Sequence, residues 1–244
     1  MTLILSLLSL VALALAGDPT LIYDLSVDGK RVGERQVTVT YKQTERGEIR
    51  LIQSWTEIQV SWAGAPMVWR QRLSAKEGST PAFTSVVDEA GRPREIQGRM
   101  SSDRFWTVTV GDKGTINTYN LRPSEVTLTS VDLIDPVRSR LLVAGPVALL
   151  VAETGTVLNG TVQDGGPTTV TVGGQEVSAH RWILRAAEGE QVLTFTDDGV
   201  LVAYDTALLG RTLSAKARAL PPPPSFGAAP TLPGGGTTLG EEAL

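Results

Sequence analysis

Cysteine is absent from the 244 residues of this chain, and histidine occurs once. Without cysteine the chain can form no disulfide, thiolate zinc site, cysteine nucleophile or lipid attachment through an N-terminal cysteine. A histidine metal site or a Ser–His–Asp triad would have to be built around His180 alone, and no G-x-S-x-G, S-x-x-K or H-E-x-x-H motif accompanies it. We therefore predict no catalytic residue, no metal site and no cofactor, and we interpret His180 as an ordinary strand residue.

Positive charge is also in short supply, since the formal net charge is −4 and the sequence pI is about 5.2. Such a chain has no positive field to gather phosphates, which argues against a nucleic-acid partner. Lys and Arg are missing as well from the start of the one long apolar run, "MTLILSLLSLVALALAGDP".

That run is nevertheless typical of a signal peptide, because Ala14-Leu15-Ala16 fits the small-x-small cleavage pattern. We predict a signal peptide over residues 1–16 with cleavage before Gly17, so that the mature protein is exported to the periplasm or the extracellular space. An uncleaved anchor is the alternative. No later segment is apolar enough to predict a transmembrane span.

The C-terminal segment 219–244, "ALPPPPSFGAAPTLPGGGTTLGEEAL", is rich in proline and glycine. Consecutive prolines favour an extended conformation, and the Gly/Thr-rich part has too little apolar area to fold. We predict a disordered tail, with a proline motif that binds a partner as the alternative.

The segment "YDLSVDGKRVGERQVTVTY" (23–41) alternates apolar and polar residues on both sides of Asp28-Gly29. A period of two is typical of strands with one wet face, and Asp-Gly is a strong hairpin signal. Gly29-Lys30 resembles part of a phosphate-binding loop, but Arg follows the lysine and a predicted strand follows the turn. The pattern therefore predicts a hairpin.

The same alternation between turn-rich separators predicts a single β-rich domain over 17–218. The further predicted strands are 48–60, 66–73, 82–88, 94–100, 104–110, 115–121, 156–163, 168–172, 176–186, 191–196 and 200–206. A turn at "DGGP" separates 156–163 from 168–172, and Asp197-Asp198-Gly199 predicts a second Asp-Gly hairpin.

One segment, 135–155, breaks this pattern. Asp135 is a candidate helix cap, Pro136 suits the first helical position, and Gly145-Pro146 would end the helix. We expect one short helix packed against the sheet, followed by an apolar segment, 147–152, that is either strand or helix. Leu141 and Leu142 in this segment are candidate walls of a pocket.

Trp55 and Trp69 are further candidate pocket residues, because aromatic side chains on a concave sheet can line an apolar pocket. Core packing is the simpler interpretation of each. Asp132 and Asp135 could be paired acids for glycoside chemistry or calcium ligands. The simpler roles are a helix cap for Asp135 and a solvent-facing position for Asp132.

Three segments carry a family resemblance: Y-x-L-x-V-x-G-x-x-V-G (23–33), "VTVGGQEVSAHRWIL" (170–184) and "LTFTDDGVLVAYDTALLG" (193–210). With them the chain resembles a family of uncharacterised exported bacterial proteins, a domain of unknown function. The resemblance implies a strongly curved antiparallel sheet, an open or partly closed β-barrel similar to periplasmic lipoprotein carriers. It implies no activity and transfers no catalytic residue.

Three functions are consistent with these observations. The first is an exported, non-enzymatic protein that binds an apolar, lipid-like ligand or an envelope component in its curved sheet. The second is a structural module that docks onto an envelope protein partner. The third is a carboxylate-dependent hydrolase of an envelope polymer, which would need two carboxyl groups at glycosidase spacing in a cleft.

Overall fold

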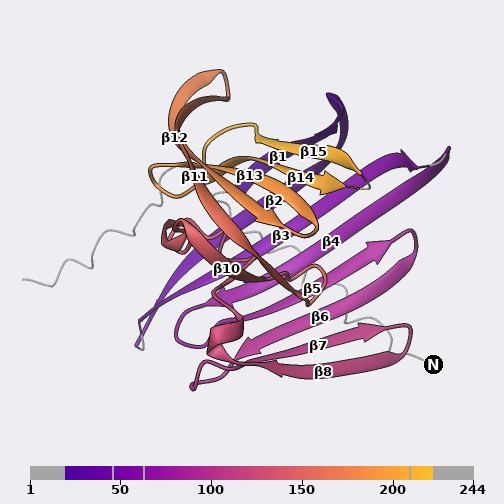
Figure 1. Cartoon of the computed structure of the whole chain (residues 1–244), viewed down its shortest axis with the longest axis vertical. Coiled ribbons are helices and arrows are strands. Elements are labelled where there is room, and N and C mark those ends of the chain that lie inside the picture. Colours follow the sequence, from indigo (N-terminus) through magenta and orange to yellow (C-terminus); the bar gives the residue numbers. More distant parts are fainter. Residues whose placement is uncertain (1–19, 46, 63, 209, 222–244) are drawn as a thin grey trace, which may run out of the picture.

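The computed structural model describes residues 20–45, 47–62, 64–208 and 210–221. Over these residues, fifteen strands form one sheet (Figure 1). The strands are β1 (Thr20–Val27), β2 (Lys30–Thr44), β3 (Gly47–Trp62), β4 (Ala65–Glu77), β5 (Ala82–Glu89), β6 (Arg92–Met100), β7 (Trp106–Asp112), β8 (Thr115–Leu121), β9 (Leu128–Thr129), β10 (Gly145–Leu150), β11 (Val157–Val172), β12 (Gln175–Ala186), β13 (Gly189–Thr196), β14 (Leu201–Leu208) and β15 (Arg211–Ala217). The predicted signal peptide, and the tail beyond residue 221, lie outside the described residues.

The sheet consists of two meanders joined at its centre. Strands β1 to β8 run outward to one edge, β15 back to β9 run outward to the other, and β1 pairs with β15 in the middle. Every neighbouring pair is antiparallel except β9 with β10. The edge strands β8 and β9 do not pair with each other, so the sheet is curved but not closed. The expectation of a mainly β fold with a curved, largely antiparallel sheet is confirmed.

The predicted turn at Asp28-Gly29 is a two-residue hairpin between β1 and β2. Val27 pairs with Lys30, and both turn residues have positive φ angles, 50° at Asp28 and 75° at Gly29. This combination is favoured in tight hairpins because its twist matches that of the strands, and glycine accepts it at little cost.

The predicted short helix is wrong. Beyond Asp135 the chain forms turns and one three-residue 3₁₀ turn, η2 (Ser139–Leu141), and a second such turn, η1 (Pro123–Glu125), follows β8. Leu142 is 5% exposed, whereas Leu141 and Val143 are 52% and 69% exposed, so residues 141–143 present no continuous apolar helical face. The sequence leaves residues 147–152 as either strand or helix. Residues 147–150 belong to strand β10, which ends at Leu150.

The predicted turn at "DGGP" is also wrong, because β11 continues through it as one strand. The register with β12 shifts between Asp164 and Gly166, and Gly166 has a φ of 79°. The glycines therefore form a bulge, which is the other local structure that glycine permits within a strand. Strand β15 was not among the predicted strands.

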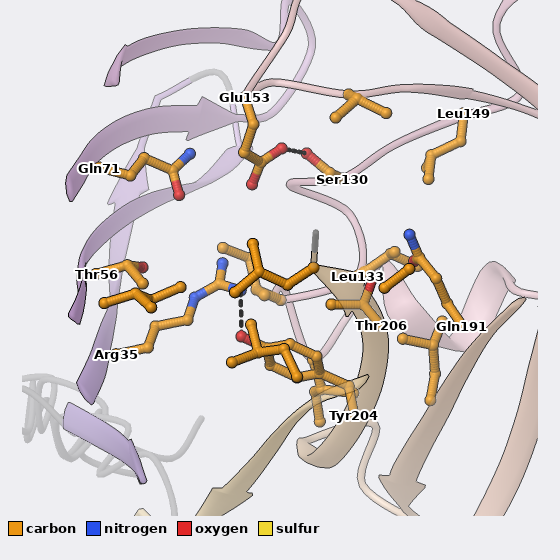
Figure 2. A pocket seen from close by; sticks show the side chains of 18 of the residues that line it. Arg35, Thr56, Gln71, Ser130, Leu133, Leu149, Glu153, Gln191, Tyr204 and Thr206 are labelled. Carbon is orange, nitrogen blue, oxygen red and sulfur yellow. Dashed lines mark hydrogen bonds between the residues drawn. The ribbon is translucent and has the colours of Figure 1, made fainter. Parts of the chain in front are cut away.

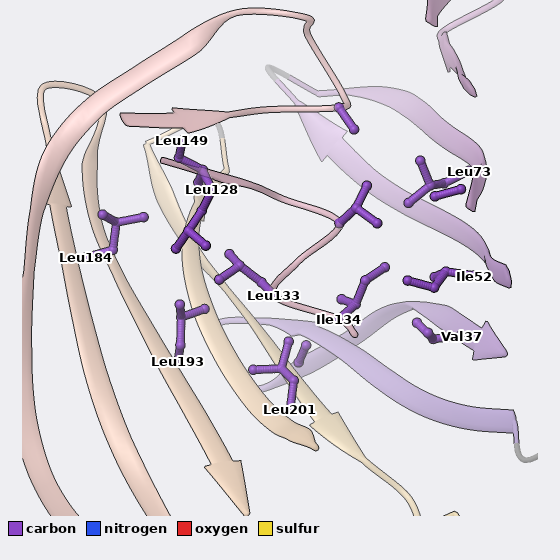
Figure 3. Packing of buried hydrophobic residues seen from close by; sticks show 14 of the residues in the cluster. Val37, Ile52, Leu73, Leu128, Leu133, Ile134, Leu149, Leu184, Leu193 and Leu201 are labelled. Atoms are coloured by element: carbon purple, nitrogen blue, oxygen red, sulfur yellow. The ribbon is translucent and has the colours of Figure 1, made fainter. Parts of the chain in front are cut away.

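The segment 130–144 enters the curve of the sheet, and its buried residues 131–135 complete the core. Figure 3 shows Leu133 and Ile134 between Leu193 and Leu201 of one meander and Ile52 of the other. Burying each of these apolar side chains contributes about 1.5–3 kcal/mol. The apolar faces of the two meanders are thus covered by each other and by this inserted segment. Among the described residues, no helix is long and apolar enough to cross a membrane.

Candidate ligand cavity inside the curved sheet

A row of polar side chains crosses the inner face of β1 to β4. The register places Tyr23 opposite Arg35, Arg35 opposite Thr56, and Thr56 opposite Gln71. We call these four residues the polar row. They occupy positions that alternation assigns to the inner face, where most neighbours along the strands are apolar.

Arg35 is the charged member of the polar row. Its Nε donates to Ser54 Oγ at 3.2 Å and its Nη1 donates to Tyr204 Oη at 3.4 Å. The guanidinium carbon lies 5.8 Å from the centroid of the Tyr204 ring, within the range of a cation–π contact. Within the described part of the chain Arg35 forms no ion pair, although the Glu153 carboxylate attracts it through space.

The other members of the polar row differ in how their hydrogen bonds are satisfied. Tyr23 Oη donates to the Leu201 carbonyl at 2.7 Å, and burial raises the pKa of this phenol. Gln71 Nε2 donates to Ser85 Oγ at 3.0 Å. Thr56 Oγ1 is buried and has no hydrogen-bond partner among the described residues. Such a hydroxyl costs about 1–3 kcal/mol when it is left unsatisfied.

Arg35, Thr56 and Gln71 line a cavity of about 340 Å³ between the two meanders (Figure 2), which we call the inner cavity. Its volume lies at the lower end of the range for small-molecule sites. Its polar wall also includes Glu153, whose Oε2 accepts from Ser130 Oγ at 3.0 Å. The apolar lining comes from Ile58, Trp69, Leu133, Ile134, Leu149, Val151, Leu193, Leu201, Leu208 and Leu213.

A second cavity, of about 780 Å³, adjoins the first, because Ile134 and Leu201 line both. We call it the outer cavity. Most of its wall is apolar and includes Leu21, Val37, Val39 and Val177, and its rim carries Arg140, Asp197 and Asp198. The two cavities together give the hollow of the sheet a mainly apolar interior with one cationic side chain at its inner end.

A second row of polar residues crosses the other end of the same strands. Tyr41 pairs with Arg50, and Arg50 pairs with Glu77. We call these three residues the charged row. Arg50 Nε donates to Asp135 Oδ2 at 2.7 Å, and Asp135 is fully buried. The inserted segment thus supplies the carboxylate for the arginine of the charged row.

Asp132 makes the neighbouring contacts of the inserted segment. Its Oδ2 accepts from the Thr129 amide at 2.7 Å, and its Oδ1 accepts from Arg138 Nε at 2.8 Å. The expected solvent-facing position of Asp132 is wrong, because the residue is 3% exposed. Asp135 caps the turn that follows it in place of the predicted helix, since its Oδ1 accepts from the Val137 amide at 2.9 Å. Neither carboxylate lines either cavity.

Glu77 is the charged-row residue whose pKa departs most from its ordinary value. Burial raises its pKa to about 8, and the carboxylates of Asp132 and Asp135 act in the same direction, while Arg138 and Arg50 oppose them. Glu77 is 3% exposed. A substantial fraction of this carboxyl group is therefore protonated at neutral pH.

The four predicted pocket residues are placed differently. Trp69 lines the inner cavity. Trp55 lies between the buried residues Ser54 and Thr56, so alternation places it on the outer face of β3. Leu142 is buried in the core, Leu141 is exposed, and neither lines a cavity. A role in ligand binding stays a prediction for these residues.

The polar row was missed at the level of sequence, although one signal was present. Arg35 has the same strand phase as Val37 and Val39, which places a charged residue among apolar inner positions. Thr56 likewise shares the phase of Ile52 and Ile58. A polar residue at a strand position that alternation assigns to the apolar face indicates that the inner face is not purely hydrophobic core at that point.

His180 lies on β12, next to the bulge in β11, and lines neither cavity. Its Nε2 lies 2.6 Å from Asp164 Oδ1, and its ring centroid lies 5.0 Å from that of Trp182. The hydrogen bond from the Gly166 amide lowers the pKa of Asp164, and the hydrogen bond with His180 lowers it further by a smaller amount. Within the described ranges, no group of three or more His, Cys, Asp or Glu side chains has the arrangement of a metal site.

These features define a class of structure: an open, barrel-like antiparallel sheet with cavities inside its curve. The chain is similar to a solved structure, the crystal structure of a β-barrel-like protein of domain of unknown function DUF1849 from Brucella abortus. The two chains are 14% identical, with a TM-score of 0.57, and the match covers 83% of this chain and 97% of the other. No protein-family model matches the sequence, and no curated protein matches it.

At this identity the likeness shows the fold and nothing further. It confirms the resemblance to an uncharacterised, β-rich barrel family that the hairpin segments indicated. What a member of such a fold binds has to be argued from the cavities of this chain.

Proposed function

We propose that this protein is exported to the periplasm or the extracellular space and binds a small apolar molecule in the hollow of its sheet without transforming it. The observation that carries the proposal is the pair of adjoining cavities, which lie between the two meanders and are lined mainly by aliphatic side chains. Concave, mostly apolar sites with a few placed polar groups are the usual form of small-molecule sites.

The buried carboxylates favour binding over hydrolysis. Asp132 and Asp135, which the sequence offered as an acid pair, each accept hydrogen bonds from an arginine and from the backbone. These contacts give both groups a structural role: Asp135 holds the inserted segment against β3, and Asp132 holds the local turn together.

Titration with a neutral apolar fluorophore, N-phenyl-1-naphthylamine, tests the proposal. We expect saturable binding at about one probe per chain, with blue-shifted emission. Thr206→Trp should weaken this binding at least tenfold, because Thr206 lines the inner cavity and the indole would occupy part of its volume.

Ser74→Trp is the matched control, since Ser74 is exposed on the outer face of β4 between buried Leu73 and Ala75. It should leave probe binding unchanged. Absence of saturable binding by the folded wild-type chain, or equal weakening by both variants, would contradict the proposed function.

A further inference from the structure

On the adjacent strands β2 and β3 two arginines, Arg35 and Arg50, face inward, and within the described residues only Arg50 of this pair has a carboxylate partner. Arg50 pairs with Asp135 at 2.7 Å and with Glu48 at 3.2 Å. Arg35, within the described part of the chain, has only hydroxyl partners. A guanidinium stays charged in a protein and is costly to bury without an anion.

Thr56 gives the second, independent observation. Its hydroxyl oxygen is buried, lacks any hydrogen-bond partner among the described residues, and belongs to a residue that lines the inner cavity. Thr56 and Arg35 lie directly opposite each other across β2 and β3. A cationic donor and an unsatisfied hydroxyl therefore stand side by side on one wall of the cavity (Figure 2).

We propose that the inner cavity binds the carboxylate of a monoanionic amphiphile, with Arg35 as its counter-ion and Thr56 as a second hydrogen-bond donor. This inference rests on the proposed function and specifies the class of ligand. A carboxylate accepts from guanidinium and hydroxyl groups together, in short charge-assisted hydrogen bonds.

The charge of the ligand follows from the other groups in the cavity. One guanidinium faces the cavity, and Glu153 lines the same space. A single negative charge is attracted to Arg35, whereas the second charge of a dianion such as a phosphate monoester would be repelled by Glu153. The geometry therefore favours a carboxylate over a phosphate.

The apolar part of the ligand follows from the shape of the hollow. Trp69, Leu149 and Leu193 surround the inner cavity, and the outer cavity continues from it past Ile134 and Leu201. An acyl chain with its acid group at Arg35 would extend along this aliphatic lining. Arg35 and Thr56 thus fix one end of the ligand, and the hydrophobic effect retains the other.

Isothermal titration of the purified chain with four probes that share a ten-carbon chain tests this inference: decanoate, decan-1-ol, decyltrimethylammonium and decyl phosphate, each below its micelle concentration or solubility limit at pH 7.5. We expect decanoate to bind at least tenfold more tightly than decan-1-ol. The cation and the phosphate should both bind more weakly than decanoate.

Two variants then assign the preference to the polar row. Arg35→Met should weaken decanoate binding at least tenfold and remove most of the preference for decanoate over decan-1-ol, and Thr56→Val should weaken decanoate binding several-fold. Arg72→Met is the matched control, because Arg72 is exposed on the outer face of β4 and should affect neither probe.

The wild-type comparison decides the matter even if Arg35→Met fails to fold. Equal affinity for decanoate and decan-1-ol would overturn the carboxylate proposal while leaving the apolar-binding function intact. Tighter binding of decyl phosphate would overturn the assignment of a monoanion. Failure of decan-1-ol and of the neutral fluorophore to bind would instead count against the proposed function itself.

Discussion

The polar row and the charged row cross the same strands of the sheet, yet they are completed in different ways. At the charged row, Asp135 from the inserted segment pairs with Arg50, while Arg138 and Asp132 pair with each other within that segment. At the polar row, no acid among the described residues pairs with Arg35, and the space in front of it is a cavity. The protein's own chain thus supplies a counter-ion for the arginine of one row and none for the arginine of the other.

The contrast separates two uses of buried charge. A buried ion pair contributes little net stability, but removing one partner is costly because the other is left uncompensated. The charged row therefore fixes where the inserted segment lies, while in the proposed function the polar row keeps a charge available to a ligand. Substitutions in both rows test this distinction.

The largest effect is expected from Asp135→Ala, which leaves Arg50 buried without its closest carboxylate. We expect a loss of about 3–5 kcal/mol in the free energy of unfolding. Urea denaturation followed by circular dichroism measures it. The paired replacement Arg50→Met with Asp135→Leu should recover much of the loss, because it removes both charges.

Arg35→Met is the comparison at the polar row. It leaves no carboxylate without its partner, so it should change the free energy of unfolding far less than Asp135→Ala does. Equal losses from the two variants would mean that the two rows are alike in their role.

A second, smaller effect is expected in the pH dependence of the free energy of unfolding, because Glu77 ionises at a different pH in the folded and unfolded chains. Its pKa of about 8 in the folded chain lies above the ordinary value of 4.5. The folded state therefore retains a proton that the unfolded state releases between these values. The stability contribution of protonated Glu77 is present below about pH 4.5 and is lost as the pH rises through about 8.

Glu77→Gln should abolish this pH dependence and stabilise the protein at pH 8 by an amount on the order of 3 kcal/mol. Melting temperatures of both proteins at pH 5, 6.5 and 8 measure the effect, and the two curves should converge at the acidic end. A constant difference at all three values would assign the effect to packing instead.

The smallest effect is expected from Thr56→Val, which replaces an unsatisfied buried hydroxyl with a methyl group of similar size. Stability should rise by about 1 kcal/mol, because the desolvation cost of the hydroxyl disappears. Ser85→Ala is its control, since the Ser85 hydroxyl accepts from Gln71 and its loss should be destabilising. A destabilised Thr56→Val protein would show that the hydroxyl has a partner in solution.

Most of the strands could be predicted from the sequence, because each reflects a local period of two. The Asp28-Gly29 hairpin is equally local, since it depends on two residues that accept positive φ. The predicted helix at Asp135 failed for a physical reason. Its capping carboxylate does bind the Val137 amide, but its other oxygen binds Arg50, which lies 85 positions earlier in the chain.

The candidate site was less accessible to sequence reasoning, because it depends on register. Arg35, Thr56 and Gln71 become neighbours only when β2, β3 and β4 pair in one particular alignment. Trp69 was identified because aromatic residues are conspicuous in a sequence. Thr56 has no such mark, and its unsatisfied hydroxyl is a property of the packed structure alone.

The pairing of β1 with β15 has a consequence for how the chain folds. Tyr23 pairs with Ala217, so the centre of the sheet forms between segments at opposite ends of the described sequence. Contacts of such long sequence separation slow folding, because the entropy of closing the loop is lost before they form. Until β15 docks, β1 and β14 each expose a bare edge to other chains, and aggregation during refolding should therefore depend on this last strand.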